Sequence, residues 1–506
     1  MTEDAVARIA KGSSLLLLGQ LISNLIAVGA FMVIARGMSK AEMGIAAVTN
    51  LLITLGVILS GAGVPVSSIR FISESRGTGS DYRPLIMASI LTRAMLTTLY
   101  SAVLVIFAGQ IASLLLGSAS NVGFIYLAIV AAIFAGFMNT LNNALIGLNR
   151  MLAVCLSYIF SASVGYSVSV LLVIKGWGAV GYILGWVASG LAGSIVSGIF
   201  LAKAVSLSLN EGKTIVKAMR TLIAFSVPVL ITNLATYAFN CFDMFVLVGL
   251  ASQEELGMYS VAKKAFSVIT MIPVNVAMAL FPYYGERYGR EELDAIRAAT
   301  AVVSRYLSLL YIPIALGLSA LAEPILIIFA GEKYAGSTPM LMIFGFFGAL
   351  TAFVPVMGYL LITYGKTKHY MAANLASISC ALSLIPLLIP RLGALTSMAL
   401  IRGVALMLLL IFYTLSTRNM ASTDYQTFIR SLTGSTLMAL LVYLLQTQFH
   451  RDFLLPLYVL VGVAIYGLYV KALKMLSYDD IALLSRLFPR PINRFVFFIG
   501  KLIASN

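Results

Sequence analysis

Long apolar stretches, separated by short polar breaks, follow one another along nearly the whole chain. Each stretch has about 18 to 25 residues, enough for a helix to cross a hydrocarbon core of about 30 Å. Helices also satisfy their own backbone, as lipid requires. The pattern therefore predicts an all-α integral membrane protein with about 14 transmembrane helices. These predicted spans lie near residues 12–35, 44–66, 85–108, 123–146, 152–174, 179–202, 224–249, 258–282, 300–322, 338–363, 370–390, 395–415, 428–447 and 453–473.

The composition leaves no room for a water-soluble fold. Of the 506 residues, 60% are hydrophobic and only 10% are charged, which is more apolar side chain than a soluble core can bury. Glu3 and Asp4 precede the first basic residues, and the first apolar stretch is too long for the core of a cleavable signal. We therefore expect this stretch to remain as the first span.

The distribution of charge predicts the orientation in the membrane. The net charge is +15, and most lysines and arginines fall in the tails and in alternate breaks between spans. This bias favours a multi-pass protein of the cell membrane with both termini in the cytoplasm. Anionic lipid on that side accounts for the charge without nucleic acid. Residues 476–506 are expected to form a cytoplasmic amphipathic tail, either a structural anchor or a docking surface for a partner.

An internal repeat divides the chain. The segment Ser39–Gly44 (SKAEMG) recurs 213 residues later as Ser252–Gly257 (SQEELG). Three further landmarks recur at similar offsets: Arg93 with Arg305, Gly147–Arg150 with Gly365–Lys368, and Gly178–Ala179 with Gly393–Ala394.

The repeat predicts two parallel six-helix lobes around a central cavity, followed by two C-terminal helices. The expected N-lobe is 1–202, the cytoplasmic linker 203–220, the C-lobe 221–415, and the two extra spans lie within 416–475. Paired lobes suit alternating access, in which the cavity opens first to one face and then to the other.

Basic residues inside the spans are the main candidates for chemistry. A charge in lipid is costly unless it faces a partner or a wet cavity. A cationic cavity fits an anionic headgroup, although each side chain alone could instead reach the interface or a backbone carbonyl. These candidates are Arg93, Lys263, Lys264, Arg305, Arg402 and, marginally, Arg430.

Asp243 is the one acidic residue inside a predicted span, at a depth similar to that of Lys263 and Lys264. A salt bridge to a lysine and a role in binding a coupling cation, Na⁺ or H⁺, are both open. Asparagines in the spans could bind sugar hydroxyls or pack against neighbouring helices. Those expected to line the cavity are Asn24, Asn50 and Asn240.

Signals of enzyme chemistry are absent from the sequence. The segments Gly212–Thr214 and Gly365–Thr367 lack the earlier glycine of a phosphate-binding loop, and no His-Glu-x-x-His pattern occurs. The three cysteines and two histidines are dispersed, so no metal site or other resident cofactor is expected. Catalytic residues are not expected either. A membrane enzyme or assembly scaffold with the same helical shell is the alternative of a different class.

Several stretches resemble the polysaccharide-transporter family, which includes O-antigen and archaeal lipid-linked oligosaccharide flippases of the multidrug/oligosaccharidyl-lipid/polysaccharide exporter superfamily. The likeness rests on Ile34–Gly44, on Gly61–Glu74, on Asp243–Gly249 leading to Leu256–Lys263, and on Ala322–Tyr334. It covers about 10–475 in order.

The resemblance implies a flippase that moves a polyprenyl-(pyro)phosphate-linked oligosaccharide to the outer leaflet for polysaccharide assembly. It implies roles for Asp243 and Lys263, and Arg36 matches the family pattern although it could simply anchor the first span at the interface. Expected partners are the lipid-linked substrate, membrane lipids and glycan-assembly enzymes. Lipid II flippases and multidrug antiporters share the architecture and remain alternatives. The absence of acidic residues from spans 1 to 6 weighs against the antiporter.

Overall fold

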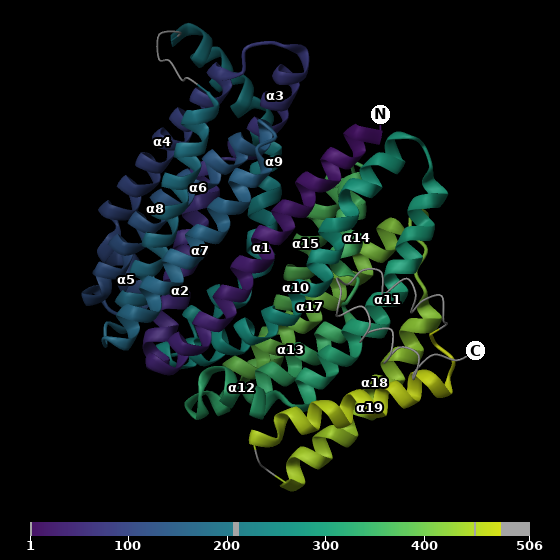
Figure 1. Cartoon of the computed structure of the whole chain (residues 1–506). Helices are drawn as coiled ribbons and strands as arrows, with labels where there is room; N and C mark the ends of the chain where they lie inside the picture. Colours follow the sequence, from purple (N-terminus) through teal and green to yellow (C-terminus); the bar gives the residue numbers. More distant parts are fainter. Residues whose placement is uncertain (1–2, 206–211, 450–451, 477–506) are drawn as a thin grey trace. The chain divides into compact units, whose positions relative to one another are not determined.

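The computed structural model describes residues 3–205, 212–449 and 452–476, and within them the chain is helical without any strand (Figure 1). Twelve of the described helices are long and apolar enough to cross a membrane, or up to 14 if each of two bent pairs counts as one span. The prediction of an all-α membrane protein with about 14 spans is therefore confirmed. The predicted tail lies outside the described residues except for Leu476, as do residues 206–211 of the predicted linker.

The chain forms two compact units, with the boundary inside one long helix. Unit 1 comprises residues 1–261 with short pieces at 374–379 and 386–398. Its main elements are α1 (Glu3–Gly37), α2 (Lys40–Gly61), α3 (Val64–Thr78), α4 (Arg83–Ile106), α5 (Ala108–Leu116), η1 (Ala119–Asn121), α6 (Val122–Gly147), α7 (Met151–Ile174), α8 (Gly178–Ala204), α9 (Gly212–Val248) and the beginning of α10 (Gln253–Gly289).

Unit 2 holds the rest of α10 and most of the chain after it. Its elements are α11 (Leu293–Ala320), α12 (Ala322–Ala330), η2 (Glu332–Ser337), α13 (Thr338–Leu350), α14 (Val354–Thr363), parts of α15 (Thr367–Leu382), α16 (Ile385–Leu392) and α17 (Ala394–Thr417), then α18 (Tyr425–Phe449), η3 (Asp452–Leu454) and α19 (Leu455–Ala472).

Several predicted spans are broken helices. The span expected at 44–66 is α2 followed by α3, because Ala62 and Gly63 take positive φ values of 46° and 77° and end α2. Pro65 then stands in the first turn of α3, a position where its missing N–H costs nothing. The spans expected at 338–363 and 370–390 are bent pairs, with breaks of 49° and 50°.

Helices α7 and α8 lie side by side in unit 1 (Figure 1), and small residues and serines join them. Ser157 and Ser161 on α7 face Ser197 and Ser189 on α8 across hydroxyl contacts of 2.8 Å. One helical turn further, a methyl group on Gly165 would collide with Ser189. Lipid offers no hydrophobic drive between helices, so close backbone approach and interhelical hydrogen bonds hold the pair together.

The two copies of the repeated motif have the same local structure and contact each other within unit 1. Ser39 and Glu42 form a capping box at the start of α2, with the Ser39 N–H donating to Glu42 Oε2 at 2.8 Å. The Ser252 N–H donates to Glu255 Oε2 at the same distance. A methyl group on Gly44 would collide with the Gln253 carbonyl, and one on Gly257 with the Lys40 carbonyl. The two helix starts therefore cross as a reciprocal, backbone-to-backbone pair.

The structure changes the alignment of a second landmark of the repeat, Gly147–Arg150 with Gly365–Lys368. Helix α6 ends with Asn149 at φ 61°, and α14 ends with Gly365 at φ 68°. In both cases the left-handed residue and its successor donate to the last carbonyls of the helix, as in a Schellman motif. Asn149 is thus the counterpart of Gly365, and the alignment of Gly147 with Gly365 is wrong by two residues because Asn takes the place of the expected glycine.

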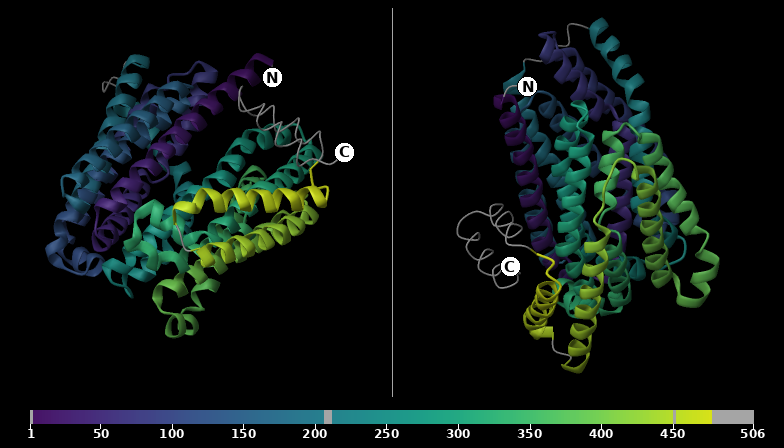
Figure 2. Two further views of the ribbon diagram at one scale, coloured as in Figure 1. Left: turned by 60° about the horizontal axis from the view of Figure 1, so that its bottom comes forward. Right: turned by 90° about the vertical axis from the view of Figure 1, so that its right-hand side faces the viewer.

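The two extra spans are α18 and α19, which lie side by side (Figure 2) and pack against α11. Ser431 of α18 donates to the Ser308 carbonyl of α11 at 2.5 Å and contacts the Tyr466 hydroxyl of α19 at 2.7 Å. A single hydroxyl therefore ties the three helices together and makes the extra spans part of unit 2.

Candidate functional site

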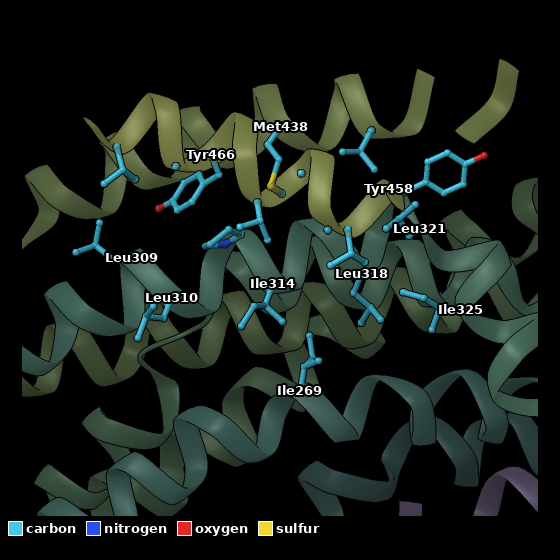
Figure 3. Close-up of a pocket in the computed structure, with 18 of the residues that line it drawn as sticks. Ile269, Leu309, Leu310, Ile314, Leu318, Leu321, Ile325, Met438, Tyr458 and Tyr466 are labelled. Carbon is cyan, nitrogen blue, oxygen red and sulfur yellow. The ribbon is translucent and has the colours of Figure 1, made fainter. Parts of the chain in front are cut away.

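An apolar groove of about 490 Å³ lies in unit 2 among α10, α11, α18 and α19 (Figure 3). Aliphatic side chains of α11, including Leu310, Ile314 and Leu318, form one wall. Met438 of α18 and the Tyr458 and Tyr466 rings of α19 form the other. Gly317 and Gly462 also line the groove, where their missing side chains leave the space open.

The polar atoms of the groove are mostly directed away from its interior. The Tyr466 hydroxyl contacts Ser431, so only its ring serves as groove wall. The Tyr458 hydroxyl is buried and has no hydrogen-bond partner among the described residues. The interior therefore suits a hydrocarbon chain, and a hydrogen-bonding ligand would find few partners.

Arg305 lies at one end of this groove. It precedes Tyr306 on α11, and its Nη2 donates to the Met475 carbonyl at 3.2 Å. The next residue, Leu476, lines the groove together with Tyr306 and Val470. Arg305, one of the predicted cations, thus lies where the apolar groove meets the segment that follows α19. Its bond to the Met475 carbonyl shows that Arg305 also ties the segment after α19 to α11.

The other predicted cations of unit 2 are partly exposed within spanning helices. Lys263 and Lys264 are neighbours on α10, so their side chains leave the helix about 100° apart and face different surroundings. Arg402 lies on α17, beside the position where Gly403 packs against the Phe347 ring of α13. These three cations therefore belong to α10 and α17, whereas Arg305 belongs to α11.

Asp243 is fully buried in unit 1, on α9. Its Oδ2 accepts a hydrogen bond of 2.8 Å from the hydroxyl of Tyr259, a residue of α10 that is also fully buried. A buried carboxylate needs hydrogen-bond partners, and the Tyr259 hydroxyl is one that the sequence pattern did not predict. The tyrosine lies one helical turn from Lys263, inside the stretch Leu256–Lys263 that carries the family resemblance, and that position is a signal that could have found it.

Arg93 is enclosed in unit 1, with 2% of its surface exposed. Its Nε donates to Thr140 of α6 at 2.8 Å, and its Nη1 donates to the Val57 carbonyl and the Ser60 hydroxyl of α2 at 2.9 and 2.7 Å. Nη2 has no partner in the described part of the chain. The cation lies near the C-terminal end of α2, where the helix dipole is negative. In this structure Arg93 is therefore a fixed internal charge.

Arg36 and the asparagines that were predicted to line the cavity differ in how far they are exposed. Arg36 is exposed in the last turn of α1, as an interfacial anchor would be. Asn50 and Asn240 are exposed within spanning helices, and Asn24 is partly buried. Asn142, in contrast, is buried and accepts from Ser197 at 2.7 Å, so it joins α6 to α8. Among the described residues, no group of His, Cys, Asp or Glu could hold a metal ion.

A polytopic helical protein with an enclosed arginine in unit 1, and with Arg305 at the end of an apolar groove in unit 2, has features that are common among membrane transporters. The family described as polysaccharide biosynthesis protein matches residues 9–287, and the MatE family matches residues 228–387. No curated protein matches the chain.

Solved transporters share the fold at low sequence identity. The lipid II flippase MurJ, in an inward closed conformation, is 14% identical with a TM-score of 0.70, covering 92% of this chain and 99% of its own. A mutant of the Vibrio cholerae MATE transporter VcmN is 14% identical with a TM-score of 0.59, covering 82% and 97%. An inward-facing MATE family multidrug resistance transporter is 15% identical with a TM-score of 0.58, covering 79% and 94%.

The chain belongs to the polysaccharide biosynthesis protein family, since that family matches more than half of its length. It is accordingly a flippase or transporter of the multidrug/oligosaccharidyl-lipid/polysaccharide exporter superfamily. Its family and structural neighbours are transporters and flippases, which excludes the membrane enzyme considered above.

The contacts of Arg93 lead to a prediction about stability. The Ser60 and Thr140 hydroxyls also donate to Gly56 and Gly136 carbonyls, so they keep a partner when the arginine is removed. We expect Arg93→Met to change the free energy of unfolding by less than about 1 kcal/mol, because the lost bonds are offset by the removed desolvation penalty. Thr140→Val leaves the guanidinium buried with fewer acceptors and should cost about 1.5–3 kcal/mol.

Unfolding of the purified variants in detergent measures both effects. A loss of stability in Arg93→Met as large as that in Thr140→Val would contradict this account of the buried charge.

Proposed function

We propose that the protein is a flippase that moves a polyprenyl-(pyro)phosphate-linked oligosaccharide from the cytoplasmic to the outer leaflet for polysaccharide assembly. The observation that carries this proposal is the apolar groove of unit 2 with Arg305 at its end. The substrate has the same two parts, an isoprenoid tail and a phosphate headgroup.

The tail accounts for the shape and lining of the groove. At about 490 Å³, the groove has the size of a site for a small organic ligand, so it would take one segment of a polyprenyl chain and leave the rest in the bilayer. Burial among Leu310, Ile314 and Met438 stabilises a hydrocarbon segment mainly by packing, since lipid is equally apolar. Helices α18 and α19 then serve to hold the tail.

The headgroup requires fixed positive charge and hydrogen-bond donors. In the proposal Arg305 contacts the phosphate at the mouth of the groove, and Lys263, Lys264 and Arg402 provide the next contacts along the path. Arg93 raises the positive potential from inside unit 1, and Arg36 acts at the end of α1. Asn24, Asn50 and Asn240 bind sugar hydroxyls, because exposed amides are costly against lipid.

Alternating access is the mechanism that we propose for the crossing. The lobes at 1–202 and 221–415, joined by the linker 203–220, would rock about the substrate, with both termini on the cytoplasmic side of the cell membrane. The helices at 416–475 would move with the second lobe. Enzymes of glycan assembly would supply the substrate on one side and consume it on the other.

A lipid II-type substrate is the second candidate, because the tail and pyrophosphate that the groove and Arg305 would recognise are common to both lipids. The fold shared with MurJ favours this candidate as far as fold alone can. A drug cation is disfavoured, since Lys263, Lys264, Arg305 and Arg402 would repel it.

Reconstituted translocation tests the proposal. We expect proteoliposomes to flip a fluorescent polyprenyl-pyrophosphate oligosaccharide. Replacing Lys263, Lys264 and Arg305 together by Gln should reduce the rate about tenfold or more, the effect of losing about 1.4 kcal/mol of headgroup binding. The matched control replaces the three exposed cations in the first turns of α9, Lys213, Lys217 and Arg220, and should keep the native rate.

Movement of a lipophilic drug cation by the native protein, without movement of the polyprenyl substrate, would reject the proposed substrate class. Equal losses in the two triple variants would reject the role of the three intramembrane cations.

We further propose that Asp243 couples transport to a cation gradient, Na⁺ or H⁺. A buried carboxylate with a phenol donor can exchange a proton or small cation as its surroundings change, and α9 and α10 both contribute to the site. A permanent structural salt bridge to a lysine is the alternative for this residue.

The Asp243→Asn variant separates these roles. If Asp243 couples transport, translocation should become slow and independent of the Na⁺ and pH gradients, because the amide cannot bind or release the ion. Tyr259→Phe keeps the carboxylate and should retain gradient dependence with an altered rate. Transport by Asp243→Asn at the native rate, with native dependence on both gradients, would eliminate the coupling role.

A further inference from the structure

A second pocket, of about 330 Å³, lies in unit 1 and has a polar lining. It is formed where α3 ends, α4 begins, α6 turns into α7, and α8 ends. Its lining residues are Arg76, Tyr82, Leu148, Asn149, Arg150 and Ala204. The charge distribution predicts that these helix ends face the cytoplasm, so the pocket is expected at the inner membrane interface. Neither the transport path nor the groove of unit 2 includes any of these residues.

Backbone and side-chain hydrogen bonds hold the frame of this pocket together. The turn at Asn149 is fixed by its own N–H, which donates to the Ile146 carbonyl, and by that of Arg150, which donates to Leu145, both at 2.8 Å. Helix α3 holds the same turn through a Ser73 hydroxyl bond to the Gly147 carbonyl and an Arg76 Nη1 bond of 2.7 Å to the Leu148 carbonyl.

Beneath the turn lies a buried apolar cluster that includes Ile72, Leu145, Val154 and Leu201. The two arginines are thus presented by a structure that already exists without a ligand.

The electrostatics of the pocket favour an anion. Arg76 and Arg150 come from separate segments, and neither forms an ion pair with any described residue. The nearby Asp81 carboxylate is directed to Arg83, accepting from its backbone N–H at 2.9 Å. No side chain caps the first turn of α7, which starts beside Arg150, so its positive end adds to the field. Lys203 is exposed next to Ala204.

The repeat supplies an internal comparison. At the corresponding end of α10 in unit 2, Arg287 is paired with Glu292, and Arg290 with Glu286 at 2.7 Å. The two arginines at the end of α10 are therefore each paired with a glutamate of the same region. At the end of α3, Arg76 forms no such pair with a described residue, although Glu74 and Asp81 are close to it in the chain, and a cavity lies beside it.

We infer that this pocket binds a phosphate ester, with Arg76 and Arg150 as donors to the phosphate oxygens and Tyr82 and Asn149 beside the esterified group. Two guanidinium groups match phosphate in charge and hydrogen-bond geometry. The volume exceeds that of the phosphate alone and admits the group that it carries. Two sources share this chemistry: the headgroup of an anionic phospholipid at the inner interface, and a soluble phosphorylated metabolite.

Binding to the purified full-length protein tests the inference. The probes are dioctanoyl phosphatidylglycerol, dioctanoyl phosphatidylcholine and glycerol 3-phosphate, each titrated in a neutral detergent and followed by native mass spectrometry. The test variant is Arg76→Gln/Arg150→Gln. The matched control is Lys366→Gln/Lys368→Gln, which removes the same charge from the equivalent turn of the second half.

We expect phosphatidylglycerol to bind the native protein about tenfold more tightly than phosphatidylcholine, and this preference to vanish in the test variant while the control keeps it. Glycerol 3-phosphate that binds as tightly as phosphatidylglycerol identifies a soluble ligand, and glycerol 3-phosphate that does not bind identifies a lipid. Arg150→Gln alone leaves the Arg76 bond to Leu148 in place and keeps the test valid if the double variant does not fold.

Equal affinities for all three probes, or equal losses in the test and control variants, would overturn the inference in favour of diffuse charge attraction. None of these readouts depends on translocation, so this site and the proposed flippase activity can fail separately.

Discussion

Removing a charge or a hydrogen-bonding group from water costs several kcal/mol unless a partner replaces the water, and a bilayer supplies no such partner. The rest of the structure depends on this constraint. It makes every span a helix, it directs the hydroxyls of α7 and α8 to each other through pairs such as Ser157 and Ser197, and it surrounds Arg93 with acceptors from α2 and α6. It also makes an intramembrane cation at the end of an apolar groove a feature that stability alone does not require.

The two units meet this constraint in different ways. In unit 1 the cation Arg93 and the carboxylate of Asp243 are enclosed and hydrogen-bonded, so both are fixed parts of the packing in this structure. In unit 2 the cations are partly exposed, and Arg305 borders a groove walled by α18 and α19. The extra helices thus add an apolar surface beside a charge. The two halves of the repeat thus differ in how they use their charged residues.

Much of the fold could be predicted from sequence, since the length of an apolar stretch and the position of Lys and Arg reflect the membrane directly. The capping box at Ser39 was equally visible, because its residues are adjacent in the chain. Breaks inside spans were visible only in part: Gly63 and Pro65 flank the break between α2 and α3, whereas the left-handed conformation of Ala62 has no signature in the sequence. The groove was also missed, because the side chains that line it have the same composition as those that face lipid. Tyr259 lies in a stretch that carries the family resemblance, but its pairing with Asp243 joins two different helices and therefore has no signature in the sequence.

The claim at the centre of this account is that the groove of unit 2 holds the tail of a lipid-linked substrate. Photolabelling with a polyprenyl phosphate that carries a photoreactive group on its tail tests it most directly, with Gly317→Leu to fill the groove and Gly198→Leu, where nothing lies within 4 Å of the added side chain's first carbon, as the control. The account predicts labels on α11, α18 and α19 that disappear in Gly317→Leu and persist in Gly198→Leu. Labels spread over the lipid-facing helices, at equal levels in both variants, would contradict it.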